Sequence, residues 1–284
     1  TFTMTDKANT LVFRSDDSIP AQISLTSGGY LTKDGVVSGE NLKLFASAKG
    51  RMDYGEGITS IDASAVDKQS VTLVGGSQGG LFTFKSGNKK RDGFEYNGGA
   101  VSISGYEAGK DRINLGNDSI SAFSINGGDV LLTLAGDAQN VISLQGAAGS
   151  EVLIHQSTNR GNSYSKMAFA DTGVLYDKAT AKATSATLWS NAGNYTADNL
   201  IKKVTVGAGV HNISITANAK VNTIIDASAA DADLTLVSGA KNDKFTGSSN
   251  ADTFVYSAGK DIIQNFGEAD SISLDKNLNT AKIS

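Results

Sequence analysis

The chain has 284 residues, with 32 glycines, one proline, two histidines and no cysteine. The lack of cysteine excludes disulfide frameworks, cysteine-ligated zinc and thiol nucleophiles. Its 25 basic and 29 acidic side chains give a net charge of −4, which argues against nucleic-acid binding because such proteins need clustered positive charge. The sequence holds no apolar run of about 18 residues, so we expect no membrane-spanning helix.

Short segments of alternating or β-branched apolar residues, separated by Gly, Asn, Asp and Ser, make up most of the chain. Such alternation indicates strands, and the small polar residues between them indicate turns. We therefore predict an all-β fold of two tandem modules of short strands. Each module is expected to contain a parallel β-roll or solenoid section, and the first is expected to be capped by antiparallel hairpins.

Two segments of the first half recur in the second half. Residues 61–65, Ile-Asp-Ala-Ser-Ala, are repeated at 225–229. The segment at 92–96, Asp-Gly-Phe-Glu-Tyr, matches Asp-Thr-Phe-Val-Tyr at 252–256. Because self-similarity at a nearly constant offset is the signature of repeat architectures, the chain reads as two copies of one unit.

The predicted modules cover residues 1–160 and 161–284. In the first, we expect a degenerate β-roll at about 70–115 and a hairpin cap at about 116–155, where Asn126-Gly127-Gly128-Asp129 is a typical hairpin turn. In the second, a better-kept roll is expected at about 234–274. Its cap is expected to be missing, so that either the chain is a fragment or a partner supplies the cap.

The second roll carries an aspartate every nine residues, each followed two positions later by a large apolar residue. The aspartates are Asp243, Asp252, Asp261 and Asp270, and the apolar residues are Phe245, Phe254, Ile263 and Ile272. This pattern resembles the hemolysin-type calcium-binding (RTX) repeats, whose unit is G-G-x-G-x-D-x-U-x with U apolar. The aspartates and the apolar positions are kept, whereas most of the glycines are not.

The resemblance implies a β-roll in which two nonapeptides complete one coil, so that residues 18 apart stack. It then places Asp243 near Asp261 and Asp252 near Asp270, and it implies Ca²⁺ as the cofactor, with these four aspartates as its ligands. Carboxylates and turn carbonyls together make the all-oxygen shell that Ca²⁺ prefers. The alternative is that each aspartate is a turn residue that hydrogen-bonds backbone and binds no metal.

The turns of such a roll direct carbonyls inward through positive φ, which glycine adopts most readily. Gly259 and Asn250 suit that conformation, whereas Lys241 and Glu268 at the equivalent positions do not.

In the first copy the nonapeptide pattern is weaker. Only Asp92 and Asp111 remain, and Gly80 and Val101 stand where the other aspartates would be. We therefore expect a metal-free roll there, held by a column of stacked apolar side chains: Phe82, Phe94, Ile103 and Ile113.

One segment has the letters of a hydrolase motif. Residues 75–79 read Gly-Gly-Ser-Gln-Gly, which satisfies G-x-S-x-G, but that motif needs a helix after the serine. A strand pattern follows instead. The sequence also lacks H-E-x-x-H, a phosphate-binding loop and a dinucleotide fingerprint. We expect no enzymatic activity.

The leading functional hypothesis is a secreted structural calcium-binding protein of the bacterial cell surface or extracellular matrix. It would be an S-layer, filament or adhesin-stalk component that self-associates into a polymer or layer. A second hypothesis is a non-catalytic RTX secretion or stability module of a larger secreted enzyme or toxin. A third is an adhesin that binds cell-surface glycans through Trp189, Tyr195 or Tyr164.

Overall fold

The computed structural model describes residues 23–24, 30–32, 34–170, 173–198 and 200–275. Strands make up 41% of the chain and helix 1%, which confirms the predicted all-β class. The helical content includes the 3-10 turn η2 (Thr180–Lys182).

The chain divides into two compact units. The first unit comprises residues 1–119, 133–145 and 155–163, and the second comprises 120–132, 146–154 and 164–284. Each unit contains parallel β-coils, so the predicted solenoid architecture is present in both.

The first unit begins with antiparallel strands and continues as parallel coils. Strands β1 to β4 pair antiparallel. Two parallel ladders follow: β4-β6-β8-β10-β14 and β5-β7-β9-β11. The strands are β1 (Ile23–Ser24), β2 (Tyr30–Leu31), β3 (Gly35–Ser38), β4 (Asn41–Leu44), β5 (Gly50–Met52), β6 (Ser60–Asp62), β7 (Val71–Val74), β8 (Gly79–Thr83), β9 (Gly93–Glu95), β10 (Ala100–Ser104), β11 (Arg112–Asn114) and β14 (Val141–Leu144).

The second unit also has antiparallel strands before its parallel coils. Strands β15 to β18 pair antiparallel, and β12 and β13 are neighbours joined by a turn with positive φ at Gly127 and Gly128. This is the predicted hairpin. The bounds are β12 (Ile120–Asn126), β13 (Asp129–Leu134), β15 (Glu151–His155), β16 (Ser165–Ala170), β17 (Val174–Tyr176) and β18 (Ser185–Leu188).

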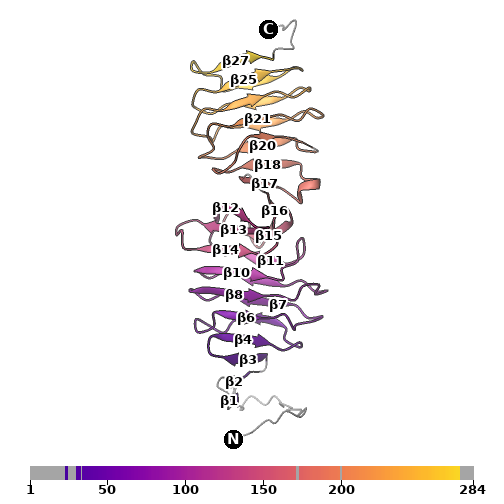
Figure 1. The fold of residues 1–284 in the computed structure, drawn as a ribbon, viewed down its shortest axis with the longest axis vertical. Coiled ribbons are helices and arrows are strands. Elements are labelled where there is room, and N and C mark those ends of the chain that lie inside the picture. Colours follow the sequence, from indigo (N-terminus) through magenta and orange to yellow (C-terminus); the bar gives the residue numbers. More distant parts are fainter. Residues whose placement is uncertain (1–22, 25–29, 33, 171–172, 199, 276–284) are drawn as a thin grey trace. The chain divides into compact units, whose positions relative to one another are not determined.

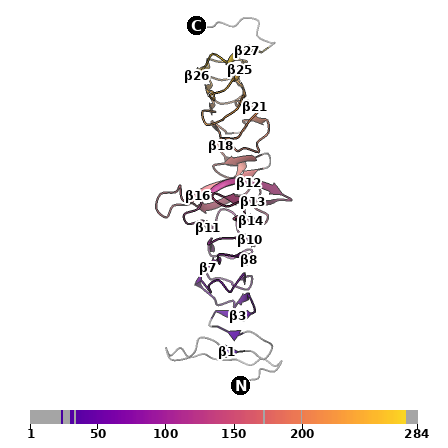
Figure 2. The ribbon, with the colours of Figure 1, turned by 90° about the vertical axis from the view of Figure 1, so that its left-hand side faces the viewer.

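The coils of the second unit stack one on another from β18 to β27 (Figure 1; Figure 2). They form the parallel ladders β18-β20-β22-β24-β26 and β19-β21-β23-β25-β27. The bounds are β19 (Tyr195–Thr196), β20 (Lys203–Val206), β21 (Ser214–Thr216), β22 (Ile224–Asp226), β23 (Thr235–Val237), β24 (Lys244–Thr246), β25 (Thr253–Tyr256), β26 (Ile262–Gln264) and β27 (Ser271–Leu274).

Register places the central residue of the three-residue strands β6, β9, β11, β21, β22, β23 and β24 in buried columns. In the first unit the four predicted core residues are at most 1% exposed. They belong to two columns rather than one, because Phe82 is paired with Ile103 in one ladder and Phe94 with Ile113 in the other. The Phe82 and Phe94 rings meet across the interior with centroids 4.7 Å apart.

The repeated Ile-Asp-Ala-Ser segments have the same local structure in both copies. Asp62 Oδ1 accepts the amide of Ser64 at 2.9 Å, and Asp226 Oδ1 accepts that of Ser228 at 3.2 Å. Each aspartate is the last residue of its strand. The repeat therefore encodes a strand closed by a side-chain-capped turn.

The replacement Phe94→Ala tests the buried columns. Phe94 is 1% exposed, so we expect the change to lower the free energy of unfolding by about 3–5 kcal/mol through lost burial and a cavity. Phe45→Ala is the control, because Phe45 is 39% exposed. Chemical denaturation monitored by circular dichroism measures both. Equal losses for the two variants would contradict the packing described.

Candidate functional site

Each of the four predicted site aspartates lies directly before a strand of the second roll. Asp243, Asp252, Asp261 and Asp270 precede β24, β25, β26 and β27 in that order. The first two are 1% exposed, which is rare for a carboxylate without hydrogen-bond partners. Their surroundings therefore have to supply donors.

The predicted stacking of residues 18 apart is present. The amide of Asp243 donates to Asp261 Oδ1 at 2.8 Å, and the amide of Asp252 donates to Asp270 Oδ1 at 2.7 Å. The structure thus brings both predicted pairs together. Within each pair, however, it is a backbone N–H of one residue that meets the carboxylate of the other.

In Asp243 and Asp252, the second carboxylate oxygen holds the turn that precedes the residue. Asp243 Oδ2 accepts the amide of Gly239 at 2.8 Å, and Asp252 Oδ2 accepts the amide of Ser248 at 2.6 Å. Their Oδ1 atoms accept amides of the previous coil, from Thr223 at 2.8 Å and Leu234 at 3.0 Å. Both oxygens of each buried carboxylate are therefore used by backbone donors.

The same arrangement occurs in the first unit. Asp92 Oδ1 accepts the amide of Val71, and Asp111 Oδ1 accepts that of Asp92, each at 2.9 Å. Asp111 Oδ2 accepts the amide of Glu107, four residues earlier, also at 2.9 Å. We call this set of bonds, from a carboxylate to an amide of the previous coil and to its own turn, the aspartate–amide ladder.

Two further side chains that hold these turns were not singled out from the sequence. Asn88 donates its side-chain amide to Asp92 Oδ2 and to the Gln69 carbonyl, both at 2.9 Å. Thr223 Oγ1 accepts the amide of Asn218 at 3.0 Å, so a hydroxyl holds the turn one coil before Asp243. The sequence signal that could have identified Asn88 is an asparagine four residues before an aspartate.

Gly80 explains why the first ladder has a gap. Its φ is +136°, and a Cβ built there would lie 1.8 Å from the Thr59 carbonyl oxygen. No aspartate fits at this position without moving the neighbouring backbone.

The side chains as they are arranged supply only part of the calcium shell that the RTX resemblance implies. Ca²⁺ takes about six to eight oxygen ligands, whereas no group of three or more His, Cys, Asp or Glu side chains is placed to hold a metal ion in the described part of the chain. Between residues 234 and 275, positive φ occurs only at Gly259 and Asn265. Lys241, Asn250 and Glu268 therefore do not turn their backbone as the motif requires. Calcium binding stays a prediction.

Burial raises the pKa of several ladder carboxyls. It raises the pKa of Asp92, Asp252 and Asp261, although hydrogen bonds donated to each carboxylate oppose the shift. The effect is largest at Asp111, whose pKa burial raises to about 6. The interior thus favours the protonated form more than water does.

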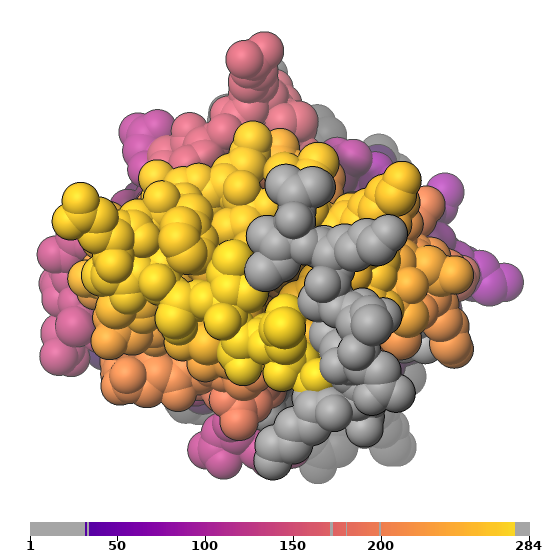
Figure 3. All heavy atoms as spheres, turned by 90° about the horizontal axis from the view of Figure 1, so that it is seen from above, coloured from indigo at the N-terminus to yellow at the C-terminus, as the bar shows by residue number. Residues whose placement is uncertain are grey.

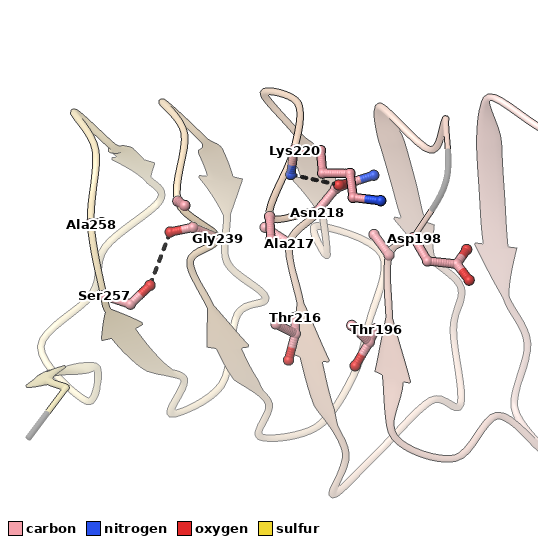
Figure 4. A pocket seen from close by; sticks show the side chains of 12 residues that line it. Thr196, Asp198, Thr216, Ala217, Asn218, Lys220, Gly239, Ser257 and Ala258 are labelled. Carbon is pink, nitrogen blue, oxygen red and sulfur yellow. Dashed lines mark hydrogen bonds between the residues drawn. The ribbon is translucent and has the colours of Figure 1, made fainter. Parts of the chain in front are cut away.

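A groove crosses four coils of the second unit, on the turns that follow β19, β21, β23 and β25. Its volume is about 530 Å³, within the range of about 300–1,000 Å³ typical of small-molecule sites. Ala197, Ala217 and Gly239 contribute small residues, and Asp198 and Lys220 contribute the charges (Figure 4). The hydroxyls of Thr196, Thr216 and Ser257 also line it.

The other candidates from the sequence are the G-x-S-x-G segment and three aromatic residues. The G-x-S-x-G segment joins β7 to β8, and Ser77 Oγ donates to Glu56 Oε2 at 2.6 Å. Tyr195 is 7% exposed, and the Trp189 ring packs edge-on against Phe123 with centroids 5.6 Å apart. Tyr164 is half-buried. These aromatic residues do not line the groove.

Comparisons with protein families, curated proteins and solved structures find no match for the chain. The structure supports the β-solenoid repeat architecture, and the narrower RTX assignment stays a prediction. In the described residues, no helix combines the length and apolar character needed to cross a membrane.

The raised pKa of Asp111 predicts a pH dependence of stability. The folded carboxyl, with a pKa of about 6 against an ordinary 3.8, holds its proton more tightly than the unfolded chain does. Its contribution to the free energy of unfolding is therefore greatest below about pH 4, falls as the pH rises to about 6, and is constant above.

The variant Asp111→Asn should lack this component. Denaturation of both proteins at a series of pH values gives the difference directly, and carbon NMR of the Asp111 carboxyl gives its pKa. A carboxyl that titrates below pH 4 would contradict the burial assigned to it.

Proposed function

We propose that this chain is a structural β-solenoid of a bacterial cell surface or extracellular layer, and that its copies associate end to end. The observation that carries the proposal is an exposed core column at the last described coil of the second unit. Figure 3 looks onto this coil, shown in yellow.

The exposed column continues the buried interior. Ile272 pairs with Phe254, which in turn pairs with Leu236 in the same ladder. Leu236 is 0% and Phe254 2% exposed, whereas Ile272 is 48% exposed. Phe266 packs its ring on Phe254 and is itself 50% exposed. Apolar side chains of the core type therefore face outward here.

The last described strands accompany these side chains. β26 and β27 are the terminal strands of their ladders in the described chain. A strand edge offers unpaired N–H and C=O groups to another chain, and a head-to-tail contact of this kind repeats into a polymer. A coil of a second copy matches both features, because it brings strands for the edges and apolar residues for the column.

The secreted, surface-bound part of the proposal is supported by the RTX-like nonapeptides. The same resemblance supports the alternative of a stability module in a larger secreted enzyme or toxin. The two differ in whether this chain associates with itself.

Ile272→Asp tests the association. Burying an unpaired carboxylate costs several kcal/mol, so we expect the variant to associate at least about 100-fold more weakly than the native chain. Ile224→Asp is the matched control, since Ile224 is 45% exposed on the outer face of β22 and outside the core column. Sedimentation velocity over a concentration series measures both, with electron microscopy of the native chain.

Two outcomes would contradict the proposal. One is a native chain that stays monomeric at high concentration. The other is equal weakening by the two substitutions.

A second candidate function is carbohydrate binding, and the groove of the second unit is the observation that favours it. A saccharide has hydroxyls that hydrogen-bond to groups such as Asp198, Lys220 and Thr216, and apolar ring faces that fit a floor of alanine and glycine. The aromatic residues expected from the sequence to bind glycans, Trp189, Tyr195 and Tyr164, take no part in this proposed groove site.

Ala240→Trp fills the groove from an exposed position on its rim, and Ala251→Trp adds the same side chain at an exposed site outside it. We expect binding to a glycan array by the native chain and by Ala251→Trp, and loss of that binding in Ala240→Trp. Binding by all three proteins alike, or by none, would reject the groove as a glycan site.

A further inference from the structure

The aspartate–amide ladder meets a need that arises at the start of each parallel strand. Thr223, Leu234 and Asp243 each stand one residue before their strand, where their amides donate to an aspartate of the next coil. A buried amide without an acceptor is costly. The carboxylate thus extends the inter-coil hydrogen bonding by one bond beyond the strand.

Three of the ladder aspartates also close their own turn, whereas Asp261 Oδ2 is buried without a hydrogen-bond partner. The Oδ2 atoms of Asp111, Asp243 and Asp252 all accept the amide four residues earlier, at 2.9, 2.8 and 2.6 Å. A turn held in this way does not need a cation to bring its backbone together. One carboxylate therefore does two things that calcium would do in a roll: it fixes the turn and it joins successive coils.

The ladder is also independent of the calcium-type sequence. Asp92 and Asp111 take part in it, although the first roll has lost the other aspartates of the nonapeptide pattern. In the second unit, the uncharged Thr223 holds its turn through its hydroxyl. The geometry is thus the same with and without the RTX-like pattern.

We propose that the aspartate–amide ladder takes the structural place of calcium in this chain, so that both rolls order without a divalent cation. The inference rests on the ladder geometry and is separate from the end-to-end association proposed above. If the ladder proposal is wrong, the folding of the single chain will show it. If the association proposal is wrong, only the sedimentation of the chain will show it.

The experiment compares the full chain in excess EDTA and in millimolar CaCl₂, by far-ultraviolet circular dichroism and thermal unfolding. We expect the same strand signal in both and midpoints within about 2 °C of each other. Asp243→Asn places an amide NH₂ against either the Thr223 or the Gly239 amide. It should lower the midpoint by roughly 5 °C, equally in EDTA and in calcium.

Glu268→Gln is the matched control, because it removes one negative charge from the same roll at an exposed side chain. Its midpoint should equal that of the native chain in both buffers. A strand signal that appears only with calcium would overturn the proposal. So would a midpoint that calcium raises by more than about 2 °C in the native chain and in Glu268→Gln. The native comparison decides the question even if Asp243→Asn does not fold.

Discussion

The amide that precedes each short parallel strand needs a hydrogen-bond acceptor, and much of this structure follows from how that need is met. Before several strands an aspartate of the following coil supplies it, with distances of 2.7–3.0 Å at the amides of Leu234, Asp243 and Asp252. Where the carboxylate also closes its own turn, as in Asp243 and Asp252, the position of the coil and the shape of the turn are fixed together. The apolar columns then stack in register inside the coils.

This construction relates the fold to a structural role. Strands of three or four residues bury little surface individually, so the stability of a coil comes from its neighbours. The last described coil therefore exposes the same kind of residue that the preceding coils bury, as Ile272 does beside Phe254. End-to-end association and the aspartate–amide ladder both follow from the repeated coils of the chain, since each coil is stabilised by its neighbours.

Much of the fold could be predicted from the sequence, because repetition leaves a trace in the spacing of residues. The nine-residue interval gave the stacking of Asp243 on Asp261, and the copied segments gave the shared turn at Asp62 and Asp226. The division of the core into two facing columns was not predicted, since it depends on which ladder each strand joins. The acceptor role of the aspartates was open, because spacing fixes where a carboxylate lies but not whether its partner is a cation or an amide.

The most direct measurement is a high-resolution crystal structure of the chain grown in millimolar calcium. The ladder predicts that Asp261 Oδ1 accepts the amide of Asp243 at 2.8 Å, with Asp243 Oδ2 on the amide of Gly239. A cation bound at about 2.3–2.6 Å to the carboxylates of both Asp243 and Asp261, with either amide bond broken, would contradict it.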